Sequence, residues 1–119
     1  MSIKKISRLL PILALVLILL TGCSSEKTSS SELESLMADG NYIIVDVRTK
    51  EEYESSHIRG AINIPYDEID ESIELEKKKK ILVYCQSGNR SKKAFVSLTN
   101  IGYNVYNLGG IEDIDLPKE

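Results

Sequence analysis

Cysteine and histidine are scarce in this sequence, with two cysteines and one histidine among 119 residues. Two thiols exclude the multi-disulfide framework that many small extracellular domains use. The two cysteines, Cys23 and Cys85, lie in different surroundings, since only Cys23 follows a long apolar stretch. The single histidine, His57, is far from Cys85 in sequence, so the sequence gives no local thiol–imidazole pair.

Long apolar runs are also rare, and the N-terminus contains the clearest one, from Leu9 to Leu20. Lys4, Lys5 and Arg8 precede this run, and Pro11 interrupts it. The run is too short to span a bilayer comfortably, and its basic flank and small-residue exit are typical of a secretory signal. The alternative is an ordinary N-terminal membrane anchor.

The run closes with Leu20-Thr21-Gly22-Cys23, which resembles the lipobox of bacterial lipoproteins. The resemblance implies that residues 1–22 are a cleaved signal peptide and that Cys23 carries lipid. A single acyl chain binds a bilayer only weakly and reversibly, whereas several acyl chains anchor a protein stably. We therefore expect a lipoprotein held on the extracytoplasmic face of the cell membrane, with residues 23–31 as a polar tether and residues 32–119 as one small domain. Cys85 would then be the only free thiol, and no internal disulfide could form.

The charge balance of the mature chain is acidic. The first 22 residues hold three of the 15 basic residues and none of the 18 acidic ones, so 12 basic residues would remain against 18 acidic ones. This excess argues against a nucleic-acid partner and against electrostatic adhesion to anionic lipid, which leaves the anchoring to the acyl chains. The lysine run from Lys77 to Lys80 is either a docking patch or, with acidic residues beside it, a solvated turn.

Hydrophobic patterning predicts strands that alternate with helices. Apolar and β-branched segments predict four strands, at 42–48, 61–65, 81–84 and 103–108. Capping-box spacings and helical periodicity predict helices that begin at Ser31 and Thr49, together with helices at 67–76 and 91–101. Gly102 supplies a helix stop, and Gly109-Gly110 follows the last strand as a turn. This alternation predicts an α/β fold with a parallel sheet covered on both faces.

The segment after the third predicted strand, Cys85-Gln86-Ser87-Gly88-Asn89-Arg90-Ser91, is the candidate site. Chemistry in a parallel α/β sheet collects where strands end and helices begin. A short loop there can direct backbone N–H groups at one point, and a helix N-terminus with a nearby arginine lowers the pKa of a cysteine to roughly 3.5–7.5. Gly88 permits an unusual backbone angle, Asn89 tolerates the left-handed region, and Arg90 can bind an oxyanion or align the loop. The alternative is that Cys85 is a small buried hydrophobe.

This loop resembles the active-site loop of the rhodanese family of sulfurtransferases. Further segments match the family in order and spacing, namely Asp46 to Tyr53, Ser56 to Pro65 and Leu108 to Ile111. The resemblance implies a rhodanese-like fold with a central, mainly parallel sheet flanked by helices, and a reaction in which Cys85 takes a sulfane sulfur from a donor such as thiosulfate. The resulting persulfide passes to a thiol or another thiophilic acceptor.

The same resemblance assigns roles around Cys85. The backbone from Gln86 to Arg90 (Gln86, Ser87, Gly88, Asn89 and Arg90) would stabilise the persulfide and bind substrate, and Arg90 would help to position the donor. No metal or organic cofactor is implied, and we expect a monomer. Four residues separate Cys85 from Arg90, whereas phosphatase and arsenate-reductase relatives have five, so the narrower loop favours sulfur over phosphate.

Other polar residues allow two interpretations. His57 is either a catalytic base or part of a structural loop, and a thiolate that its own loop stabilises needs no base. Asp46 and Arg48 either contact substrate or form a hydrogen-bonded brace. The domain as a whole is either an enzyme or a non-catalytic or thiol-redox sensing and binding module at the cell surface, although an intact Cys85 argues against an inactive module.

The chain departs from the family pattern in two places. Ile114 stands where an aromatic residue, frequently tryptophan, is usual, so we expect a smaller side chain at the rim of the pocket. The usual first strand is nearly missing, and only residues 27–30 are available to form it. The edge of the sheet is therefore expected to be weak.

Overall fold

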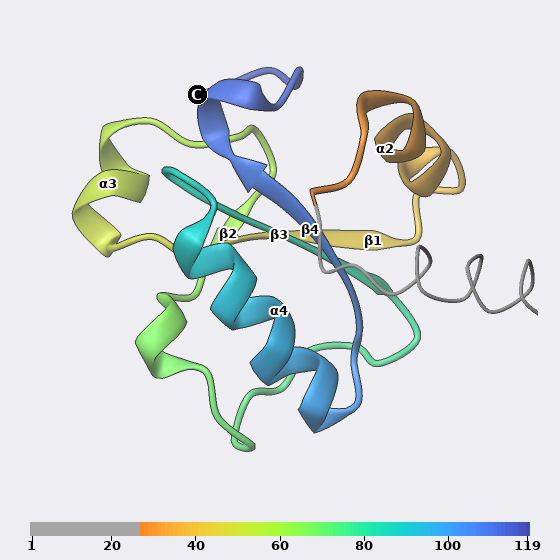
Figure 1. The fold of residues 1–119 in the computed structure, drawn as a ribbon, viewed down its shortest axis with the longest axis vertical. Coiled ribbons are helices and arrows are strands. Elements are labelled where there is room, and N and C mark those ends of the chain that lie inside the picture. Colours follow the sequence, from red (N-terminus) through yellow and green to blue (C-terminus); the bar gives the residue numbers. More distant parts are fainter. Residues whose placement is uncertain (1–26) are drawn as a thin grey trace, which may run out of the picture.

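A computed structural model describes residues 27–119 of the chain. The predicted signal peptide and Cys23 lie outside these residues. Within them, four parallel strands form one sheet in the order β2-β1-β3-β4. Figure 1 labels the four strands. The strands are β2 (Ile62–Asn63), β1 (Tyr42–Asp46), β3 (Lys80–Cys85) and β4 (Asn104–Gly110). The prediction of a parallel α/β sheet is confirmed.

The helices lie on both faces of this sheet. They are α2 (Ser30–Met37), α3 (Lys50–Ser55) and α4 (Asn89–Ile101), with the short 3₁₀ helices η1 (Tyr66–Glu68) and η2 (Ile111–Asp113). In Figure 1, α4 crosses the front of the sheet, α2 lies near its right-hand end and α3 near its left-hand end. No helix in residues 27–119 is long and apolar enough to cross a membrane.

Strand alternation divides the core into two clusters, one on each face. Leu82 and Tyr84 of β3 point to the face that carries Leu33 of α2 and Ile111 of η2. Their neighbours on β3 point to the opposite face, against α4. Successive side chains of a strand alternate between faces, so Cys85 shares the α4 face with Ile81 and Val83. The alternation of side chains along β3 therefore places the Cys85 sulfur on the face that α4 covers.

The ends of two helices follow from local hydrogen bonding. Thr49 caps α3 in a complete capping box with Glu52, as the spacing predicts. Gly102 ends α4 with a left-handed φ of 114°, which also agrees with the prediction. Ser29 caps α2 by accepting a hydrogen bond from the Glu32 N–H, so the prediction that this helix begins with a capping box at Ser31 is wrong.

The prediction of a helix at 67–76 is also wrong, because only the short 3₁₀ helix η1 forms there. The Asp70 carboxylate accepts a hydrogen bond from the Ser72 N–H at 2.8 Å, and such a turn competes with helical hydrogen bonding. Tyr103 then fixes the segment, since its hydroxyl donates to the Ile73 carbonyl at 3.0 Å and accepts from the Leu75 N–H at 3.1 Å. Tertiary contacts replace the helical ones.

The two glycines predicted as a turn belong to the last strand instead. Gly109 pairs with Tyr84 and Gly110 pairs with Cys85, after a register shift that leaves Leu108 as an extra residue in β4. At the edge of the sheet, the Thr28 N–H donates to the Asn107 carbonyl at 2.8 Å, and no strand forms there among the described residues. Within residues 27–119, the expected weak edge thus consists of one backbone hydrogen bond beside β4.

Candidate functional site

Cys85 is the last residue of β3, and its side chain is fully buried. The chain turns through Gln86, Ser87 and Gly88 and enters α4 at Asn89. This arrangement places the thiol at the carboxyl end of a central strand and at the N-terminus of the helix that covers it. The predicted strand–loop–helix geometry around Cys85 is therefore present.

Gly88 makes this tight turn possible. Its φ of 99° lies in the left-handed region, which favours glycine. In this conformation the Gly88 N–H donates to Cys85 Sγ over 2.9 Å. Asn89 is the first residue of α4, and no non-glycine residue in 27–119 has a positive φ, so the loop does not use the tolerance of Asn89 for the left-handed region.

The hydrogen bonds around the sulfur favour its thiolate form. Burial raises the pKa of the Cys85 thiol, but hydrogen bonding with the Ser91 side chain and with the backbone N–H groups of Ser91, Gly88 and Ser87 outweighs burial and lowers the pKa below its usual value. Ser91 Oγ lies 3.5 Å from Sγ, and its own proton is donated to the Gly88 carbonyl at 3.0 Å. One hydroxyl thus connects the sulfur to the loop. The alternative of a small inert hydrophobe does not fit these contacts.

Gly110 holds the loop from the side of β4. A Cβ atom at this position would lie 2.7 Å from the Gln86 carbonyl oxygen, which is closer than real Cβ contacts. Only glycine allows this close approach of β4 to the loop without a shift of backbone. This role of Gly110 is not evident from the sequence, where a glycine pair after a strand is typical of a turn.

Arg48 lies beneath the loop and is nearly buried. Its guanidinium donates from Nε and Nη2 to both carboxylate oxygens of the fully buried Asp46, with Nη2 only 2.6 Å from Oδ2. It also donates to the Gln86 side-chain carbonyl at 3.0 Å and to the Ser56 backbone carbonyl at 2.6 Å. The interpretation of Asp46 and Arg48 as a hydrogen-bonded brace is confirmed, and the brace orients the first residue of the loop.

Arg90 is held by a carboxylate of its own. Its Nη1 and Nη2 donate to the two carboxylate oxygens of Glu52, at 2.6 and 3.0 Å. The hydrogen bond from Arg90 lowers the pKa of Glu52 to about 2, with further lowering by hydrogen bonds from Thr49. Of the two roles that the sequence allows for Arg90, this geometry supports loop alignment. Glu52 was missed as a site residue because its capping-box position gives it a sufficient structural role.

His57 serves as a connection between α3 and the C-terminal segment. Its ring stacks on Tyr53 with centroids 3.8 Å apart, and Nδ1 lies 2.8 Å from the Tyr53 carbonyl oxygen. Nε2 lies 3.3 Å from Oε1 of Glu119, and the backbones of His57 and Glu119 exchange two hydrogen bonds. These contacts agree with a structural role and not with a base for Cys85.

A cleft of about 460 Å³ opens beside the loop. It is lined by Gln86, Arg48 and Glu52, together with residues of α3, η2 and the C-terminal segment. The cleft therefore reaches the loop at Gln86, the residue that follows the buried Cys85. Ile114, which was expected at the rim, is instead buried in the core against the α2 face of the sheet. No group of three or more potential metal ligands occurs in residues 27–119.

Comparisons with known proteins agree with this architecture. The thiosulfate sulfurtransferase PspE of Escherichia coli (strain K12) is 42% identical over 78 residues, which cover 62% of this chain and 75% of PspE. The tRNA uridine(34) hydroxylase of Erwinia tasmaniensis is 34% identical over 89 residues, which cover 68% of this chain but only 25% of the hydroxylase. The chain thus spans a quarter of that second relative.

Solved structures give the same result. The human single-domain sulfurtransferase TSTD1 superimposes with a TM-score of 0.62 at 30% identity, covering 73% of this chain and 92% of that protein. A rhodanese with anions from E. coli gives a TM-score of 0.56 at 35% identity, covering 66% and 96%. The family model described as the rhodanese-like domain matches residues 29–115. The chain therefore belongs to the rhodanese-like domain family, whose members include sulfurtransferases.

Proposed function

We propose that the protein is a sulfurtransferase that moves a sulfane sulfur from a donor such as thiosulfate to a thiophilic acceptor through a persulfide on Cys85. One observation carries the proposal: the buried Cys85 Sγ accepts the Gly88 N–H at 2.9 Å at the N-terminus of α4. This contact stabilises negative charge on sulfur, and a thiolate, not a thiol, attacks sulfur. The 42% identity to a thiosulfate sulfurtransferase supports the same reaction class.

The proposed reaction has two half-reactions that balance. The Cys85 thiolate attacks the outer sulfur of thiosulfate, the sulfur–sulfur bond of thiosulfate breaks, and sulfite leaves with the bonding electron pair. The acceptor thiolate then attacks the outer sulfur of the persulfide and regenerates the Cys85 thiolate. The backbone from Gln86 to Arg90 stabilises the negative charge on sulfur both in the thiolate and in the persulfide. Glu52 holds the side chain of Arg90 and thereby keeps this part of the loop in place.

Turnover of two substrates tests the reaction class. Only four residues separate Cys85 from Arg90, one fewer than in the phosphatase relatives, and this spacing motivates the choice of sulfur over phosphate. The purified protein should therefore release sulfite from thiosulfate with a thiol or cyanide acceptor. It should leave aryl phosphates essentially untouched. Phosphatase activity without sulfur transfer would contradict the proposal, and mixed disulfides without persulfide would indicate a thiol-redox module instead.

We also propose that the protein is a lipoprotein anchored through Cys23 on the extracytoplasmic face of the membrane. Leu20-Thr21-Gly22-Cys23 after a short apolar run motivates this proposal. A Cys23→Ala variant should accumulate as unprocessed precursor without acyl mass, as measured by mass spectrometry of the membrane fraction. Unchanged processing and membrane retention would show that the lipobox interpretation is wrong.

A further inference from the structure

The segment that leads into α2 is docked on the domain. The Thr28 N–H donates to the Asn107 carbonyl at 2.8 Å, and Lys27 Nζ lies 3.5 Å from the Asp113 carboxylate. The alkyl chain of Lys27 packs over Gly109, where a Cβ atom would lie 3.1 Å from the Cγ and Cδ atoms of the lysine. These three contacts hold the segment against β4 and η2.

The docking place lies next to the loop that follows Cys85. A Cβ atom on Gly88 would lie 3.9 Å from the Cα atom of Gly109, so the glycine under Lys27 is a direct neighbour of the loop. Lys27 and Asn89 also line the same hollow, which has a volume of about 300 Å³. The segment is therefore held at the end of the sheet at which β3 ends in Cys85.

The connection between this segment and the proposed lipid is short. Cys23 lies only four residues before Lys27. An extended chain spans at most about 3.6 Å per residue, so the two residues can be no more than about 14 Å apart. An acylated Cys23 would thus keep Lys27, and the loop beside it, close to the bilayer surface, because the docked segment leaves no long linker.

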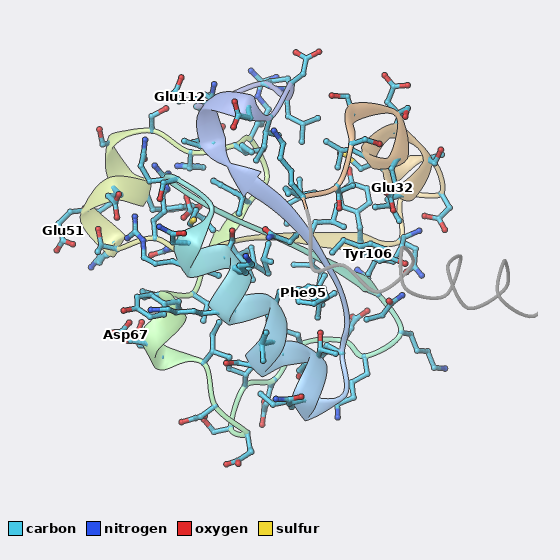
Figure 2. All side chains as sticks on the ribbon, in the orientation of Figure 1. Glu32, Glu51, Asp67, Phe95, Tyr106 and Glu112 are labelled. Carbon is cyan, nitrogen blue, oxygen red and sulfur yellow. The ribbon has the colours of Figure 1, made fainter. Side chains whose placement is uncertain are left out.

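Two hollows flank Lys27, and they differ in charge. The hollow next to the loop contains the Lys27–Asp113 pair together with Lys92. The other hollow, of about 360 Å³, contains Glu32 and Tyr106, which Figure 2 labels on α2 and β4. Neither Lys92 nor Glu32 has an ion pair within residues 27–119. The hollow next to the loop therefore presents a positive charge and the other hollow a negative charge.

We propose that the hollow of Lys27, Asn89 and Lys92 faces the headgroups of the anionic bilayer that holds the Cys23 lipid. Such a surface attracts Lys92 and repels Glu32, so it favours this side of the domain over the α2 side. The acyl chains supply the anchoring, and the charges supply only the orientation. The inference rests on the proposed lipid anchor, and it means that the loop exchanges sulfur at the membrane surface.

Two asparagines on α4 allow a matched measurement of this orientation. Asn89 lines the hollow, whereas Asn100 lies about 16 Å further along the helix axis, and both side chains are exposed. In a Cys85→Ser background, Asn89→Cys or Asn100→Cys receives a fluorophore. The full lipoprotein is then placed in vesicles of phosphatidylcholine and phosphatidylglycerol, some of whose headgroups carry a nitroxide quencher.

We expect the fluorophore at position 89 to be quenched at least about twofold more than the fluorophore at position 100, because it lies closer to the headgroups. Lys92→Gln should lower this ratio in vesicles with phosphatidylglycerol and leave it unchanged in phosphatidylcholine alone. Thr28→Pro removes the N–H that docks the segment and should bring the ratio close to one. Thr28→Ala keeps this N–H and is the matched control, which should leave the ratio unchanged.

Two outcomes would overturn the inference, and they are distinguishable. Equal quenching at the two positions, or stronger quenching at Asn100, in a folded protein bound to the vesicles would show that the hollow does not face the bilayer, although the lipid anchor stands. A protein that carries no acyl mass and does not stay with the vesicles would overturn the proposed anchor together with this inference.

Discussion

Two arginine–carboxylate pairs hold the loop that follows Cys85, and they differ in burial. In the Asp46–Arg48 pair, the arginine side chain is 4% exposed and the carboxylate 0%. In the Glu52–Arg90 pair, the corresponding values are 25% and 31%. Both pairs have a shortest distance of 2.6 Å, so burial and not geometry distinguishes them.

The difference in burial predicts different losses of stability when one partner of each pair is removed. Removal of one partner from a buried pair leaves an unpaired charge in a poorly solvated place, which costs about 3–5 kcal/mol. Water can solvate a partner released from the half-exposed pair, so its loss costs about 1 kcal/mol or less. We therefore infer that Asp46–Arg48 belongs to the fold and that Glu52–Arg90 chiefly sets the position of the loop.

The largest predicted effect is the loss of the buried carboxylate. Asp46→Asn keeps the side-chain shape but leaves Arg48 without its counter-ion, so the free energy of unfolding should fall by about 3–5 kcal/mol. Urea denaturation followed by circular dichroism measures this change. A double variant, Asp46→Asn/Arg48→Met, should recover part of the loss, and a single variant as stable as wild type would contradict the brace.

Glu52→Gln should affect activity more than stability. Glutamine can retain the capping-box hydrogen bonds with Thr49, while the charge that binds Arg90 is lost. We expect kcat/KM for thiosulfate to fall about tenfold through loop misplacement, with about 1 kcal/mol less stability. Lys50→Gln on the same helix, which removes only an exposed charge pair with Glu54, is the control. Equal activity in both variants would show that Arg90 needs no partner.

The same carboxylate should produce an acid-dependent loss of stability. Arg90 lowers the pKa of folded Glu52 from 4.5 to about 2. A depressed folded pKa stabilises the protein above the unfolded pKa, so this contribution is complete above about pH 4.5 and is lost as the pH falls towards 2. Chemical denaturation at several pH values should show a shallower decline in Glu52→Gln than in wild type. Parallel profiles would exclude this linkage.

The smallest predicted effect on activity concerns His57. His57→Ala removes the stack on Tyr53 and the contacts with Glu119, which should cost about 1–2 kcal/mol of stability. The rate of sulfur transfer should change less than the stability, because the ring stack and side-chain hydrogen bonds of His57 go to Tyr53 and Glu119 and not to the loop from 85 to 91. A loss of activity in a fully folded variant would reinstate His57 as a base.

Sequence reasoning succeeded where local physics determines the outcome. Buried strands such as 81–84, the Thr49 capping box and the stop at Gly102 all depend on nearby residues, and the structure confirms them. The position of Cys85 follows from the same strand and helix. These features are sufficient to locate the site.

Sequence reasoning failed where distant contacts decide. The segment 67–76 is acidic and helix-compatible, but Tyr103 binds it in another conformation. Gly110 was expected in a turn, although its missing side chain instead lets β4 approach the loop. Arg90 could not be assigned a partner because Glu52 is 38 residues away. Such pairings depend on how the sheet brings α3 and α4 together.

The most direct test of Cys85 as the sulfur carrier is the intact mass of the protein after incubation with thiosulfate. We expect a gain of one sulfur atom on the wild-type protein, its removal by dithiothreitol, and no gain in Cys85→Ser, which should keep the wild-type circular dichroism spectrum. A Cys85→Ser variant that still gains sulfur or transfers it, or a folded wild-type protein that never gains sulfur, would contradict the assignment of Cys85 as the sulfur carrier.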